Sequence, residues 1–249
     1  MSREGASSSY LAMFAHVASR PEPELDLGHA ALLIAEPEYP GLDVAYYVSL
    51  LDKLGDEARR RCIDGNEVVR RIGRLLYDEV GFEGNETDYY DPRNSFINEV
   101  IDRRTGIPVT LAVVYMEIAR RAGVAAQGVA FPGHFLVQVP VKGAAVHVDP
   151  FTGKALSTQE LRQLLGRATG ETKDPDAALL EPVPKRQILI RMLNNLRSIY
   201  TSRGDQDRLR RTVEQLSVLA PQDDGLRRDL QALGGTIHVP GKRSGRSVN

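Results

Sequence analysis

The sequence predicts a fold of the α+β class, in which helices are segregated from one short block of strands. Residues 105–123 read as a long apolar helix opened by Pro108, which suits a first helical turn because its missing N–H costs nothing there. Three strand-like runs follow, at 124–131, 134–140 and 144–150. Segments of helical periodicity flank this block on both sides, which is the pattern of an α+β fold.

The segments before the block are predominantly helical. Apolar residues recur at helical spacing over residues 7–20, 29–36, 43–61 and 65–82, with Asp43 and Asn66 as expected N-caps. Residues 83–96 are rich in Gly, Asn and Asp and predict a loop. A further helix is expected over 94–106, capped by Asn94 or Ser95 and closed by Gly106.

The segments after the block are helical as well. Ser157 followed by Glu160 forms a capping box, which predicts a helix over 157–168. Beyond a linker, residues 185–235 contain two helices and part of a third, a spacing that suits one helical-repeat unit. Because about three repeats are needed for independent stability, we expect this unit to dock on the core as a cap. The tail at 235–249 is rich in Gly, Ser and Arg and is expected to be disordered.

Composition narrows the possible functions. The 249 residues carry a formal net charge of -1, which gives no electrostatic argument for binding nucleic acid or an anionic membrane. No apolar run reaches the roughly 18–20 residues that span a bilayer, and the first 19 residues read as a short helix and not a signal peptide. A single cysteine, Cys62, excludes an intrachain disulfide framework and a cysteine-based zinc site. A cytoplasmic protein is therefore expected.

Two polar residues interrupt the strand-like runs. His134 follows the Pro132-Gly133 turn, and Asp149 directly precedes Pro150. If their runs pair as neighbouring strands, the imidazole and the carboxylate face each other near the start of the apolar helix. That pair makes up two-thirds of a nucleophile, base and orienting-residue set.

Several blocks of sequence resemble the bacterial SirB-type branch of the transglutaminase-like superfamily, whose members usually carry a tetratricopeptide-like tail. The resemblance covers about residues 24–225. It rests on LDLGHAALLIAEPEYPGLDVAYYVSLLDKL, NSFINEVIDRRTGIPVTLAVVYMEIARRAGV, GVAFPGHFLVQV, HVDPFTG and LNNLRSIY, in that order. It implies a papain-like α+β core, in which a helix bearing the nucleophile position packs on an antiparallel sheet bearing a histidine and an aspartate.

This resemblance divides the chain into four parts: a helical N-terminal region (1–88), the transglutaminase-like core (89–168), tetratricopeptide-like helices (183–234) and the tail (235–249). His134 in PGHF and Asp149 in HVDPF match the histidine and aspartate of active members of the superfamily. Those members open the helix with a cysteine, whereas Pro108, Val109 and Thr110 occupy that window here. The resemblance therefore implies a remnant His–Asp dyad, with Thr110 at the nucleophile position.

Threonine is a poor substitute for the cysteine. Its alcohol has a far higher pKa than a thiol, and its branched Cβ restricts the approach of a substrate. A helix-start residue bonded to the backbone explains Thr110 as well, and a helix cap explains Ser95. Asn94, Asn98, Glu99 and Gly133 are expected to shape the cleft, while Tyr89 and Tyr90 fit either a cleft wall or loop packing.

Three functional hypotheses follow, and the first is favoured. It is a non-catalytic scaffold or regulatory binding module without a cofactor, whose partner is a protein or peptide and not nucleic acid or a membrane. The second is a cysteine-independent hydrolase or amidase that uses His134 and Asp149 with water or Thr110. The third is a metal-dependent enzyme, because His147 shares a strand face with Asp149 and, with His134, completes a common ligand set.

Cys62 has two interpretations. It lies between two predicted helices beside Arg59, Arg60 and Arg61, and nearby guanidinium groups can lower a thiol pKa and make it reactive. A small residue that packs a corner between helices explains the same position, and this second interpretation is favoured.

Overall fold

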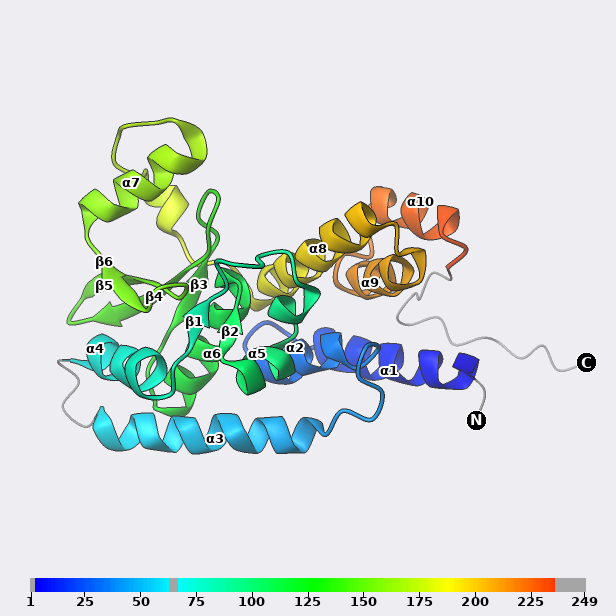
Figure 1. Cartoon of the computed structure of the whole chain (residues 1–249), viewed down its shortest axis with the longest axis horizontal. Helices are drawn as coiled ribbons and strands as arrows, with labels where there is room; N and C mark the ends of the chain where they lie inside the picture. Colours follow the sequence, from blue (N-terminus) through cyan, green and yellow to red (C-terminus); the bar gives the residue numbers. More distant parts are fainter. Residues whose placement is uncertain (1–2, 63–66, 236–249) are drawn as a thin grey trace, which may run out of the picture.

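The computed structural model describes residues 3–62 and 67–235, and it shows helices gathered around a small antiparallel sheet (Figure 1). This arrangement confirms the α+β class. The expected cap Asn66 and the expected disordered tail, apart from Gly235, lie outside the described residues.

The helices cover most of the described chain. In chain order they are α1 (Arg3–Ala18), α2 (Leu27–Ala35), α3 (Val44–Arg61), α4 (Val68–Gly73), the π-helix η1 (Arg74–Glu79), the 3-10 helix η2 (Pro92–Ser95), α5 (Ile97–Arg103), α6 (Pro108–Arg121), α7 (Thr158–Thr169), the 3-10 helix η3 (Ala177–Leu180), α8 (Lys185–Arg203), α9 (Gln206–Leu219) and α10 (Asp224–Ala232).

The strands form two sheets. The first is a short parallel pair, β1 (Glu83–Gly84) and β2 (Thr105–Gly106). The second is antiparallel with the order β3-β4-β5-β6. Its strands are β3 (Gln127–Val129), β4 (Leu136–Val141), β5 (Ala144–Asp149) and β6 (Lys154–Leu156).

Helix α6 lies at the centre of the fold, because every residue from Pro108 to Ala119 is buried. Two glycines let neighbouring helices approach it closely. A Cβ on Gly28 of α2 would lie 2.8 Å from a carboxylate oxygen of Glu117, and one on Gly55 of α3 would lie 2.2 Å from Cβ of Arg121. Arg121 also pairs with the buried Glu117 and, at 2.6 Å, with Asp52 of α3. These contacts fix α2 and α3 against α6.

The four-stranded sheet is covered on both faces. Alternate residues such as Val137, Val139 and Val148 join the main core around α6. The opposite face contributes residues such as Leu136 to a smaller apolar cluster under α7, which lies on the other side of the sheet from α6 (Figure 1). The Ser157–Glu160 capping box that opens α7 is present, as predicted.

Helix α8 belongs to the main core. Its buried side chains, among them Met192 and Leu196, pack in the same apolar cluster as those of α2 and α6. A short connection at Gly204 and Asp205 then turns the chain into α9, with α10 beyond it (Figure 1). The division between a core at 89–168 and a unit at 183–234 stays a prediction.

Some predicted boundaries were wrong. The expected helix over 94–106 is two elements, η2 and α5. Helix α5 ends at Arg103, and the C-cap residue Arg104 adopts the left-handed conformation with φ 59. Gly106 instead lies in β2, where a Cβ would approach the Val100 side chain to 2.9 Å. The periodic segment over 65–82 changes to π-helical geometry at Arg74.

Among the described residues, no helix combines the length and the apolar character that crossing a bilayer requires.

A matched pair of glycine variants tests the packing of η1 on the β5–β6 turn. Gly153 and Gly143 both adopt positive φ, 75 and 82. A Cβ at Gly143 meets nothing within 4 Å, whereas one at Gly153 would lie 2.3 Å from the Tyr77 ring. We expect Gly143→Ala to lower the free energy of unfolding by about 1 kcal/mol through backbone strain alone. We expect Gly153→Ala to lower it by about 2–4 kcal/mol, because overpacking adds to the strain. Urea denaturation measures both, and equal losses would contradict the packing described here.

Candidate functional site

His134 and Asp149 lie side by side at one end of the four-stranded sheet. His134 comes two residues before β4, and Asp149 is the last residue of β5. His134 Nε2 donates a hydrogen bond to Asp149 Oδ1 at 2.7 Å, and the two side chains are 15% and 8% exposed. The structure thus brings together the two residues that the sequence predicted to face each other.

This hydrogen bond also sets the tautomer of the imidazole. An ionised carboxylate can only accept, so Nε2 of His134 carries the hydrogen. Nδ1 has no hydrogen-bond partner among the described residues. The Phe151 ring and the imidazole are arranged edge to face, with ring centroids 6.3 Å apart.

The Asp149 carboxylate holds the β5–β6 turn as well as the imidazole. Its Oδ1 also accepts from the backbone N–H of Phe151 at 2.8 Å, and its Oδ2 accepts from the Thr152 hydroxyl at 3.1 Å. Burial raises the pKa of Asp149, but the hydrogen bond and charge of His134 and the donors of the turn outweigh it, so the pKa lies below its usual range. The carboxylate is therefore a fixed anion whose oxygens all serve the local structure.

The turn is joined to the rest of the fold through Phe151. Its carbonyl accepts a hydrogen bond from Gly84 N at 3.0 Å. The Phe151 ring occupies the space where a Cβ of Gly84 would lie, only 2.3 Å away. Close approach of β1 to the turn therefore requires glycine at position 84.

The start of α6 presents a buried alcohol. Thr110 is 0% exposed, and its Oγ1 has no hydrogen-bond partner among the described residues. The neighbouring elements η2 and α5 carry two more buried polar atoms without a partner there, Ser95 Oγ and Asn98 Oδ1. No surface of Thr110 is accessible to a substrate in this conformation.

A pair of buried asparagines organises the loop that precedes α5. Asn85 Nδ2 donates to Asn94 Oδ1 at 3.0 Å, and Asn94 Nδ2 donates to the carbonyls of Asp88 and Tyr89 at 2.7 and 3.3 Å. Asn85 Oδ1 accepts from Asp88 N at 2.9 Å. The backbone carbonyl of Asn94 accepts from Ile107 N, immediately before α6. The loop is thus tied to the start of the central helix.

Comparison with known proteins gives the family. Residues 45–194 match the family model described as "Transglutaminase-like superfamily". The chain belongs to this superfamily. It is 38% identical over 229 residues to a UPF0162 protein of Xylella fastidiosa, which covers 88% of this chain and 80% of that protein.

Two further relatives differ in how much of their own length the match covers. A UPF0162 protein of Pseudomonas aeruginosa is 34% identical over 198 residues, covering 78% of this chain and 72% of that protein. Human F-box only protein 21 is 34% identical over 148 residues, covering 56% of this chain but only 23% of that protein. No solved structure matches the chain.

Within this transglutaminase-like domain, the other expected cleft residues have different surroundings. Asn94 serves the loop network, and Asn98 is buried on α5. Glu99 faces Tyr39, between α2 and α3, and adds to the rise that burial causes in the pKa of that phenol. Gly133 has φ 66, and a Cβ there would lie 2.9 Å from Cβ of Ala168 at the end of α7. These four residues are not joined to the His–Asp pair by any hydrogen bond among the described residues.

His147 does not join His134 and Asp149. Its Nε2 lies 3.4 Å from Nε2 of its cross-strand neighbour Gln138, which also donates to the Leu180 carbonyl. Burial lowers the pKa of His147, which favours the neutral imidazole. Among the described residues, no three His, Cys, Asp or Glu side chains are arranged to hold a metal ion, so the predicted three-ligand set is not formed.

Cys62 occupies the C-cap of α3 and is half-buried. Burial raises the pKa of its thiol, although Arg71 and Arg61 act in the opposite direction. The thiol therefore lacks the lowered pKa of a reactive cysteine.

Sequence reasoning missed Asn85, Phe151 and Thr152. Phe151 and Thr152 follow Asp149 directly, and an aspartate that begins a turn commonly bonds the backbone two residues on, so this signal was available. The pairing of Asn85 with Asn94 gave no periodic signal in the sequence.

Removal of the Asp149 carboxylate is expected to lower the free energy of unfolding. Asp149→Ala leaves the His134 N–H, the Phe151 N–H and the Thr152 hydroxyl without their acceptor, so we expect a loss of about 2–3 kcal/mol at neutral pH. Asp174→Ala is the control, because Asp174 forms only a surface ion pair with Arg162 and its side chain is 54% exposed. A loss of under about 0.5 kcal/mol is expected there.

The contribution of Asp149 to the free energy of unfolding depends on pH. The folded pKa of Asp149 lies below its unfolded value of about 3.9, so its contribution is fully present above that pH and disappears as the pH falls through the folded pKa. The difference in unfolding free energy between wild type and Asp149→Ala should therefore shrink in acid. A difference that stays constant or grows on acidification contradicts this interpretation.

Proposed function

We propose that this transglutaminase-like chain is a non-catalytic protein-binding module of the SirB-type branch, acting as a scaffold or regulator in the cytoplasm. The observation that carries the proposal is Thr110, a completely buried alcohol at the start of the central helix, where active relatives are expected to open the helix with a cysteine. Thiol acyl transfer needs a thiolate within reach of its imidazole. The only cysteine, Cys62, is the C-cap of a different helix, α3, and burial raises the pKa of its thiol.

The His–Asp pair supports this assignment through its bonding. Asp149 accepts three hydrogen bonds, and two of them come from the turn that follows it. Such a carboxylate is part of the local architecture whether or not the imidazole does chemistry. We assign it a structural role.

The size of one relative supports a role as a module. The matching segment of human F-box only protein 21 is 23% of that protein, so a domain of this kind occurs there as one part of a much larger chain. We further propose that α8, α9 and α10 form about one and a half tetratricopeptide-like units. In that case, the sharing of one core by α8 and α6 makes the unit a cap on the domain and not an independent array.

A hydrolase or amidase is the rival function, and one observation favours it. His134 keeps an orienting carboxylate at 2.7 Å, is partly exposed, and has an unbonded Nδ1 that could take a proton from water. Nothing comparable supports the metal-dependent alternative.

An activity panel distinguishes the two functions. We expect no turnover of amide and ester probes above the buffer rate by the purified chain, with His134→Ala, Asp149→Asn and the isosteric Thr110→Val all indistinguishable from wild type. Circular dichroism provides the control for folding. Turnover that disappears in His134→Ala and Asp149→Asn would establish the rival, and its additional loss in Thr110→Val would identify the nucleophile.

A further inference from the structure

Two exposed tyrosines lie next to each other on the loop before η2. Tyr89 is 39% exposed and Tyr90 69%, and their rings meet edge to face with centroids 5.4 Å apart. They are two of the four large apolar side chains that the described residues expose most. Exposed aromatic side chains of this kind are typical of binding surfaces, where tyrosine and arginine supply much of the affinity.

The loop that carries them is held rigidly. Buried Asn94 bonds the carbonyls of Asp88 and Tyr89, and buried Asn85 bonds Asn94 and the backbone N–H of Asp88. A loop fixed in this way loses little conformational entropy when it binds. The tyrosines are thus presented in advance of any partner.

Helix α8 adds positive charge to this loop. Arg203 Nη2 donates to the Tyr90 carbonyl at 3.1 Å. Arg191 lies close enough to Tyr89 to oppose the rise that burial causes in its pKa. Among the described residues, neither arginine has a carboxylate within ion-pair distance. Glu86 and Asp88 precede the tyrosines and reduce the net charge of the loop, but they pair with neither arginine.

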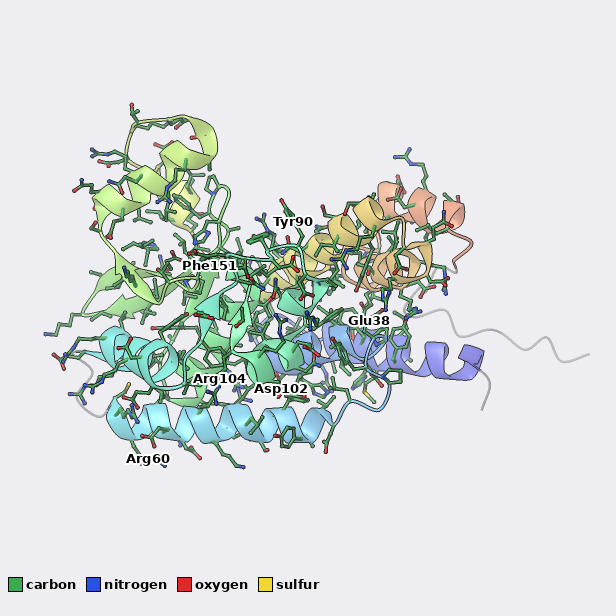
Figure 2. The ribbon with its side chains drawn as sticks, viewed as in Figure 1. Glu38, Arg60, Tyr90, Asp102, Arg104 and Phe151 are labelled. Carbon is green, nitrogen blue, oxygen red and sulfur yellow. The ribbon has the colours of Figure 1, made fainter. Side chains whose placement is uncertain are left out.

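The loop also begins next to the end of the sheet, because Gly84, the residue before Asn85, donates its backbone N–H to the Phe151 carbonyl at 3.0 Å. Figure 2 shows Tyr90 near the upper outline of the molecule, between α7 and α8, and Phe151 lower, next to the sheet. Phe151 is the residue whose ring is arranged edge to face with His134. The tyrosines therefore lie on the loop that leaves the end of the sheet where the His–Asp pair lies.

We infer that Tyr89, Tyr90, Arg191 and Arg203, together called the tyrosine face, bind an acidic segment of a partner protein. This inference rests on the proposed binding function and names the chemistry of its partner. Guanidinium groups without a carboxylate of their own are free to form charge-assisted hydrogen bonds with Asp or Glu of the partner. The tyrosine rings supply apolar contact area next to those charges. A single-stranded nucleic acid could use the same residue types, but the net charge of -1 disfavours it.

Peptide display on the full-length chain tests the tyrosine face. A random peptide library and a labelled oligouridylate are the two probes. Fluorescence anisotropy then measures the affinity of the chain for each selected peptide and for the oligouridylate. We expect enrichment of acidic peptides whose affinity falls at least about tenfold in Tyr90→Ala and in Arg203→Glu. Added salt should also weaken the binding of these peptides to the wild-type chain, because salt screens the exposed charges.

Two variants serve as matched controls. Tyr46→Ala removes another exposed tyrosine, which is 50% accessible and meets the Tyr47 ring edge to face. Arg228→Glu reverses the charge of an exposed arginine on α10, which also has no ion pair among the described residues. Both should bind the selected peptides as wild type does.

Several outcomes overturn the inference: no enrichment, neutral or basic selected peptides, binding unaffected by Tyr90→Ala and Arg203→Glu, or tight binding of the oligouridylate alone. Peptides that bind through another surface would refute the tyrosine face while leaving the binding module intact. Hydrolysis of probes that depends on His134 would instead refute the proposed function itself.

Discussion

The Asp149 carboxylate fixes the position at which three parts of the fold meet. One oxygen accepts from His134 and from the backbone of Phe151, and the other accepts from Thr152. Phe151 in turn pairs with Gly84 of β1, which is parallel to β2 just before α6. A single buried anion thus ties the β5–β6 turn, the segment before β4 and the approach to the central helix.

The burial of α6 limits what a side chain near its start can do. Its first three turns are enclosed on every side, by α2 and α3, by the sheet, by α5 and by α8. A side chain at position 110 therefore contributes to packing, and any residue of suitable volume satisfies that requirement. In the proposed module, binding therefore falls to the outer loops, which this buried interior holds in place.

Features that depend on residues close together in the sequence were predicted correctly. His134 and Asp149 lie on adjacent runs joined by a tight turn, so their approach follows from antiparallel pairing, and Ser157 with Glu160 specifies its own helix cap. The left-handed conformation of Arg104 was not predictable from propensity, because a glycine two residues later seemed the better helix stop. The tertiary requirement for glycine in β2 decided the outcome.

Nonlocal polar contacts account for most of what sequence reasoning missed at the site. Asn85 and Asn94 are nine residues apart in a loop, and no periodicity links them. His147 was correctly placed on the face of Asp149, yet Gln138 and the distant Leu180 determine its contacts. Shared strand faces therefore identified candidates, whereas the partners depended on where η3 returns to the sheet.

A double-mutant cycle on His134 and Asp149 tests the central claim, that this pair is structural, most directly. The unfolding free energies of wild type, His134→Ala, Asp149→Ala and the double variant give the coupling energy between the two side chains. A structural pair predicts that both single variants are less stable than wild type, with a coupling of about 1–3 kcal/mol. Coupling near zero, or single variants that are more stable than wild type, would contradict it, because residues kept for catalysis are commonly retained at a cost in stability.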